Sequence, residues 1–133
     1  MTKKEYLSQA FILNKDIKRK EIRIDALKSS LGVVATNYDD TRVKTLPHSP
    51  FESRLTMIID LENELEKDKE ELENLKMQIW RSIHSIGNDT VATVMELRYI
   101  AFENWPEIAE ELGYSLSYVF TLHRIGLKTV RVA

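Results

Sequence analysis

The sequence predicts an all-α protein in which a long antiparallel helical hairpin, paired as a coiled coil, precedes a C-terminal helix-turn-helix bundle. Two long stretches carry apolar residues in alternating three- and four-residue steps, the spacing of a coiled-coil seam. Only 4 Gly and 3 Pro occur in 133 residues, with 43% apolar and 30% charged residues, so long helices are favoured over disorder. The expected domains are residues 1–86 and 87–133.

The first expected helix covers residues 4–31. Its seam is interrupted only at Lys20, and apolar residues beside the seam indicate contact with more than one partner helix. The seam residues are Tyr6, Ala10, Leu13, Ile17, Ile24, Leu27 and Leu31. At ~1.5 Å per residue, this helix would be about 42 Å long.

Residues 32–49 form the expected loop, because Gly32 is placed to end the first helix and turn-forming residues follow it. The loop is longer than the ~4–6 residues usual between packed elements. We interpret it as a solvated connector. The alternative is phosphate contact through its three basic side chains, Arg42, Lys44 and His48.

The second expected helix covers residues 50–86, with Ser49 as its cap and Pro50 at its first position. Its apolar stripe consists of Leu55, Ile58, Leu65, Leu72, Ile79, Ile83 and Ile86. The middle of this helix is densely charged, with opposite-sign pairs at helical spacing. Each exposed pair contributes only ~0.2–0.5 kcal/mol, so these charges keep the helix solvated rather than hold the fold together.

Opposite charges favour pairing between the two long helices. Residues 1–48 carry a net charge of +4 and residues 49–86 a net charge of −4, as complementary flanks would. The competing use of the first helix is DNA contact through its basic cluster, Lys15, Lys18, Arg19, Lys20 and Arg23. Because the hairpin alone buries little apolar surface for its length, we expect a homodimer through the coiled coil. A single-copy partner such as RNA polymerase is the alternative.

A third helix is expected to follow Gly87, which is placed to close the second long helix. The cluster Asn88–Thr90 is placed to cap it, and it runs to about Phe102. Trp105 is expected to hold this helix against the next turn, since an indole is seldom left fully exposed. The apolar residues that would support the following helices are Val91, Val94, Met95, Leu97, Ile100 and Ala101.

The stretch Asn104–Lys128 has the spacing of a helix-turn-helix. Two short helices that cross steeply need a small residue at their contact and a flexible residue at the turn, which Ala109 and Gly113 supply. The residues placed to start or cap the helices are Asn104, Pro106, Glu107 and Ser115. The inward-facing residues are Ile108, Leu112, Val119 and Leu122. The alternative is an ordinary helical hairpin in an all-α core.

This segment also resembles a known family. The positions that match are Leu97, Arg98, Tyr99, Ile100, Trp105, Glu107, Ile108, Ala109, Leu112, Gly113, Tyr114, Ser115, Val119, Leu122, His123 and Leu127. They resemble the C-terminal domain of the phage regulators typified by ArpU and RinA, which is similar in turn to the promoter-reading domain of primary sigma factors. The likeness is best over residues 94–130. It implies a phage- or prophage-encoded protein that controls late-gene transcription by binding double-stranded DNA.

Residues 115–128 are the expected recognition helix, which would lie in the major groove. The residues expected to contact DNA are Ser115, Leu116, Ser117, Tyr118, Phe120, Thr121, His123, Arg124 and Lys128. Net charge is +3 from Ser115 onward, with no carboxylate side chain, against −5 from Gly87 to Tyr114. The corresponding sigma-factor helix is richer in Arg, Glu and Gln, so a role in protein contact stays open for Tyr118 and Phe120.

Other function classes are disfavoured. We expect no enzyme, metal or cofactor, because the three histidines are far apart and the four glycines are isolated. No cysteine is present, and no apolar run approaches the ~20 residues of a membrane span, so we expect a soluble, cytoplasmic protein with no membrane partner. The alternatives to a regulator are a coiled-coil assembly protein, such as a small DNA-packaging subunit, and an adaptor that binds only protein.

Overall fold

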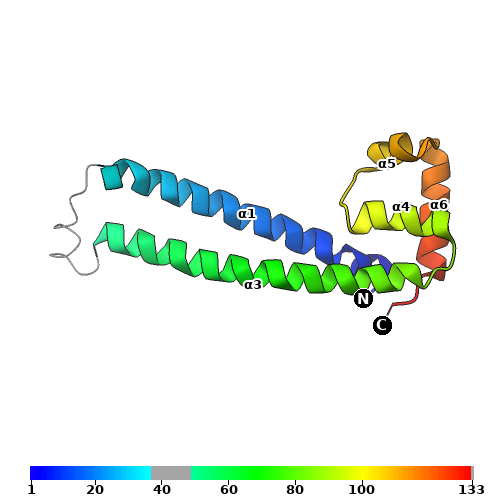
Figure 1. The fold of residues 1–133 in the computed structure, drawn as a ribbon, viewed down its shortest axis with the longest axis horizontal. Coiled ribbons are helices and arrows are strands. Elements are labelled where there is room, and N and C mark those ends of the chain that lie inside the picture. The colour runs from blue at the N-terminus through cyan, green and yellow to red at the C-terminus, as the bar shows by residue number, and fades with distance from the viewer. Residues whose placement is uncertain (37–48, 133) are drawn as a thin grey trace. The chain divides into compact units, whose positions relative to one another are not determined.

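The computed structural model describes residues 1–36 and 49–132. These residues form helices and no strand, so the predicted all-α class is confirmed (Figure 1). The helices are α1 (Lys3–Thr36), α3 (Pro50–His84), α4 (Asp89–Tyr99), α5 (Trp105–Leu112) and α6 (Leu116–Thr129). A search of the described residues finds no helix with the length and apolar character needed to cross a membrane.

Contacts group the chain into two compact units. One unit is Lys15–Glu70, and the other joins Met1–Asn14 to Glu71–Ala133. Both long helices contribute to both units. The division expected from the sequence, 1–86 and 87–133, stays a prediction.

The first helix does not end where the sequence indicated. α1 continues through Gly32 to Thr36, so the predicted stop at Gly32 is wrong. A glycine inside a helix costs only about 1 kcal/mol relative to alanine, which helical neighbours can offset. The rest of the predicted loop, with Arg42, Lys44 and His48, lies outside the described residues.

The start of α3 agrees with the prediction. Pro50 is its first residue, where a missing backbone N–H leaves no hydrogen bond unmade. The Ser49 hydroxyl accepts a hydrogen bond from the backbone N–H of Glu52 at 3.1 Å, as an N-cap does.

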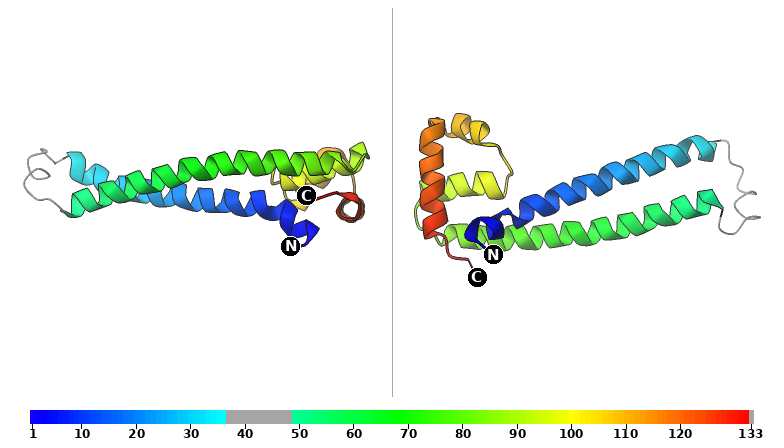
Figure 2. Two further views of the ribbon diagram at one scale, coloured as in Figure 1. Left: turned by 90° about the horizontal axis from the view of Figure 1, so that it is seen from below. Right: turned by 180° about the vertical axis from the view of Figure 1, so that it is seen from behind.

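In the unit Lys15–Glu70, α1 and α3 run in opposite directions (Figures 1 and 2). Two ion pairs agree with this antiparallel direction. Lys28 pairs with Glu62, whereas Lys20, which comes earlier in α1, pairs with Asp68, which comes later in α3. The buried apolar residues of this unit are Ile17, Ile24, Leu31, Ile58 and Leu65, all members of the predicted seams. Leu55 was expected on the seam as well but is exposed.

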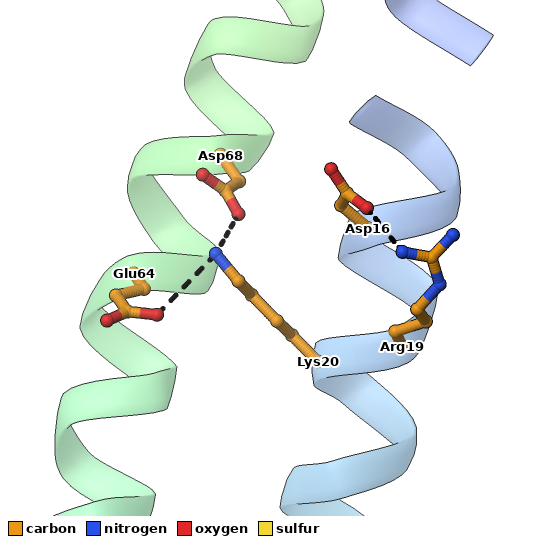
Figure 3. A network of polar contacts seen from close by, with 5 residues as sticks. All are labelled: Asp16, Arg19, Lys20, Glu64 and Asp68. Atoms are coloured by element: carbon orange, nitrogen blue, oxygen red, sulfur yellow. Dashed lines mark hydrogen bonds and ion pairs between the residues drawn. The ribbon is translucent and has the colours of Figure 1, made fainter. Parts of the chain in front are cut away.

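Lys20 interrupts the apolar seam of α1 because it meets two carboxylates of α3 (Figure 3). Its Nζ lies 2.5 Å from Asp68 Oδ2 and 3.5 Å from Glu64 Oε2. The hydrogen bond to Asp68, aided by the nearby negative charges, raises the pKa of Lys20 above its ordinary value. The neighbouring Arg19 pairs with Asp16 at 2.8 Å. Part of the basic cluster of α1 is therefore neutralised within its own unit.

The second unit contains α4, α5 and α6, and α6 runs across the other two helices (Figures 1 and 2). Asn88 caps α4 by accepting a hydrogen bond from the backbone N–H of Val91 at 3.1 Å. α4 ends at Tyr99, earlier than the predicted end near Phe102. The C-cap is Ile100, with a φ of −111°, and Phe102 beyond it has a φ of 61°, a left-handed conformation that a helix does not contain. Ala101 is consequently exposed rather than part of the supporting core.

Candidate nucleic-acid interface

A reciprocal cap begins α5. The backbone N–H of Glu107 donates to Asn104 Oδ1 at 2.9 Å, and the backbone N–H of Asn104 donates to Glu107 Oε1 at 3.2 Å. Pro106 occupies the first turn, where its missing N–H costs nothing. This is the capping box that the sequence predicts.

A three-residue turn, Gly113–Ser115, joins α5 to α6. Gly113 has φ 70° and ψ 30°, the left-handed conformation that glycine adopts most readily. The backbone N–H of Tyr114 donates back to the Ala109 carbonyl at 2.9 Å, which satisfies one of the last carbonyls of α5. The turn therefore satisfies part of the end of α5 while the chain changes direction sharply into α6 (Figure 1).

Ser115 fixes the start of α6. Its hydroxyl accepts a hydrogen bond from the backbone N–H of Tyr118 at 3.1 Å. Unlike the other helices of the described residues, α6 has no acidic residue in its first turn. The positive end of its helix dipole is therefore not neutralised by a side chain of its own helix.

The inner face of α6 packs closely against α4. Val119 is fully buried and Leu122 nearly so, as expected for inward-facing residues. Gly126 was not singled out from the sequence, yet a Cβ built there would lie 2.6 Å from Met95 Sδ. This glycine permits the close approach of the two helices.

Trp105 joins all three helices of this bundle. The Arg98 guanidinium of α4 lies 4.4 Å from its ring centre and also donates to the Glu103 carbonyl at 3.1 Å. The rings of Phe120 and His123, both on α6, make T-shaped contacts with the indole at centroid distances of 5.3 and 4.6 Å. The predicted role of Trp105 in holding the support helix against the turn agrees with these contacts.

His123 is not at the surface, so its placement among the DNA-contacting residues is wrong. It is buried, and its Nε2 lies 2.6 Å from the Tyr99 hydroxyl. Burial, together with the positive charges of Lys4 and Arg98, lowers the pKa of His123 to about 4. Burial also raises the pKa of Tyr99 to about 12. Near neutral pH this is an uncharged, hydrogen-bonded pair inside the bundle.

The other predicted contact residues lie on the outer part of α6. Thr121 is half-buried, and its hydroxyl donates to the Ser117 carbonyl at 3.1 Å. The exposed members are Ser115, Leu116, Ser117, Tyr118, Phe120, Arg124 and Lys128. Ile125 is also exposed and was not predicted. This outer surface combines hydroxyl, aromatic, aliphatic and cationic side chains.

The segment before α6 is acidic. A hydrogen bond with Glu111 is the main cause that raises the pKa of Glu103 to about 7, with a further contribution from Glu107. The Glu103 carboxyl is therefore protonated for part of the time near neutral pH. Opposite charges are thus separated along the bundle, with carboxylates on and before α5 and cations on α6.

The C-terminal end of α6 is held by the rest of its unit. Lys3 Nζ donates to the Lys128 carbonyl at 3.0 Å, where a cation complements the negative end of the helix dipole. The backbone N–H of Arg131 donates to the Ser85 hydroxyl at 3.1 Å. The outer residues of α6 consequently project from a helix that is fixed at both ends.

Comparison of the chain with family models, with curated proteins and with solved structures finds no match. Among residues 1–36 and 49–132, no group of three or more His, Asp or Glu side chains is arranged to hold a metal ion.

Proposed function

We propose that this chain is a sequence-specific DNA-binding transcription regulator, encoded by a phage or prophage and acting in the cytoplasm without enzymatic activity. In this proposal α5 and α6 form a helix-turn-helix, carried by a helical hairpin of residues 1–86, and α6 enters the major groove. A homodimer formed through the long helices would present two such heads, and RNA polymerase is the alternative partner.

The observation that carries the proposal is the electrostatic character of α6. Its first turn has no acidic residue, its exposed side includes Arg124 and Lys128, and no carboxylate side chain occurs from Ser115 onward. An uncompensated helix N-terminus attracts phosphate, and exposed cations add a salt-dependent attraction. The resemblance of residues 94–130 to the ArpU and RinA regulators supports the same assignment.

The outer residues of α6 have chemistry suited to the groove. Arg124 can pair with guanine or with phosphate, and the hydroxyls of Ser117 and Tyr118 can serve either purpose. Leu116 and Phe120 can contact thymine methyl groups. His123 contributes indirectly, through packing against Trp105.

A protein-only adaptor is the second candidate, and one observation favours it. Four apolar or aromatic side chains on α6 are 38–46% exposed, namely Leu116, Tyr118, Phe120 and Ile125. Contiguous exposed apolar side chains often mark protein interfaces. The experiment must therefore separate DNA binding from protein binding.

Fluorescence anisotropy provides that test, with the DNA upstream of the chain's own gene, a scrambled duplex, and two salt concentrations. We expect tighter binding to the native duplex and weaker binding as salt rises. The double variant Arg124→Ala/Lys128→Ala should bind at least tenfold more weakly, and its salt slope should fall by about 1 for each lost phosphate contact.

A matched control is available on α1. Lys18→Ala/Arg23→Ala also removes one exposed lysine and one exposed arginine, from the basic cluster that is the competing DNA contact. We expect near wild-type affinity for this variant. Absence of binding to either duplex at concentrations above the ~10⁻⁶–10⁻⁴ M of non-specific contact would favour the adaptor instead.

A further inference from the structure

An exposed apolar patch lies on α3 beside the end of α4. Met77 and Trp80 are 50% and 43% exposed, and Ile100 lies next to them. Together with Glu73 and Lys76 they line an open hollow of about 370 Å³. Single exposed apolar residues are ordinary, but a grouped set around a hollow indicates an interaction surface.

The indole of Trp80 is held in place although it is exposed. Its ring centroid is 3.9 Å from that of His84, and His84 Nε2 lies 2.8 Å from Glu96 Oε1. A side chain that is already ordered loses little conformational entropy on binding. Tryptophan is also among the residues most enriched at binding hot spots. Trp80 is therefore suited to be the anchor of an interface.

We infer that a second copy of this chain docks on this patch, which we call the Trp80 patch, with two-fold symmetry. A two-fold interface uses the same surface on both copies, so every contact occurs twice. The patch meets this requirement because it contains both an anchor, Trp80, and a hollow beside it. Each copy can place its indole in the hollow of the other.

The charges around the patch favour a second copy over an unrelated partner. Glu73 and Lys76 have opposite signs and line the same hollow. If Glu73 of one copy meets Lys76 of the other, symmetry repeats the pair on the opposite side. Lys76 also lies 5.1 Å from the Phe102 ring centre, which restrains its position. A partner with a patch of one sign would satisfy only one of the two residues.

Sedimentation of the full chain over a range of concentrations tests this inference independently of any DNA. We expect a reversible dimer, and Trp80→Ala should raise its dissociation constant at least tenfold. Met77→Ala should weaken the dimer as well. Met57→Ala is the matched control, because Met57 is on the same helix and is also 50% exposed, and it should leave the dimer unchanged. Circular dichroism checks that each variant keeps its helices.

Charge reversal gives a second readout. Glu73→Lys and Lys76→Glu should each weaken self-association, because each places like charges together at both symmetric positions. An equimolar mixture of the two variants should associate again, since the reversed charge at position 73 of one then faces the reversed charge at position 76 of the other. A chain that stays monomeric, or a Trp80→Ala variant that dimerises like wild type, would overturn the inference.

Discussion

Acid should destabilise the second unit through His123. This residue is buried against Tyr99 and Trp105, and burial is the main cause that lowers its pKa to about 4. In an unfolded chain the imidazole has an ordinary pKa of about 6.5. The unfolded state therefore binds a proton at a higher pH than the folded state does.

The sign and size of the effect follow from this difference. Stability from the neutral imidazole is fully present above about pH 6.5 and is lost as the pH falls through about 4. Each pKa unit corresponds to about 1.4 kcal/mol, so the loss approaches roughly 3 kcal/mol. This is a substantial fraction of the ~5–15 kcal/mol that holds a typical domain folded.

Urea unfolding followed by circular dichroism, from about pH 7 down to about pH 4, measures this loss. His123→Phe keeps an aromatic ring beside Trp105 but removes the titration, so its stability should depend less on pH. Its stability at neutral pH should fall by about 1–3 kcal/mol, because the Tyr99 hydroxyl is left without its partner. Tyr99→Phe is the companion control, which removes the hydrogen bond but keeps the imidazole and its acid sensitivity. If His123→Phe lost stability with acid as steeply as wild type, the assignment to His123 would be refuted.

Three further predictions use the same unfolding and binding measurements. Gly113→Ala should cost about 1–2 kcal/mol of unfolding free energy from backbone strain alone, since no heavy atom lies within 4 Å of the added Cβ; an unchanged urea midpoint would contradict the strain. Lys20→Ala should cost less than about 1 kcal/mol, and the cost should shrink in high salt, as for other partly exposed ion pairs. Trp80→Ala should weaken DNA binding only at low protein concentration, because it would remove the dimer rather than a DNA contact. An equal loss of affinity at all protein concentrations would contradict an effect through the dimer.

The local features of the fold were the ones that sequence could predict. The caps at Asn104 and Ser115 each depend on residues three positions away, and both occur as expected. The turn at Gly113 likewise needs only a residue that tolerates positive φ. The predicted end of α1 at Gly32 was wrong, because the free-energy cost of a glycine inside a helix is small and the neighbouring helical residues can offset it.

Features that depend on distant partners were missed or misjudged. His123 comes four residues after Val119 and three before Gly126, a spacing that places it on the inner face. A polar side chain favours a surface position unless a buried partner forms a hydrogen bond with it. That partner, the Tyr99 hydroxyl, is 24 residues away, so local spacing does not reveal it. Gly126 was missed for the same reason, since its role appears only when Met95 of α4 is placed against it. At position 123, the helical spacing indicates burial more reliably than the polar character of the side chain indicates exposure.

The first turn of α6 supports DNA binding more strongly than net charge does. A helix whose only requirement was stability would gain about 0.3–1 kcal/mol from an acidic residue near its N-terminus. α4 and α5 use this device through Asp89 and Glu107, whereas α6 does not. An incoming phosphate would supply the missing negative charge, and a carboxylate there would repel it. The carboxylates on and before α5 oppose phosphate contact by that helix, so in this proposal the attraction to DNA comes from α6.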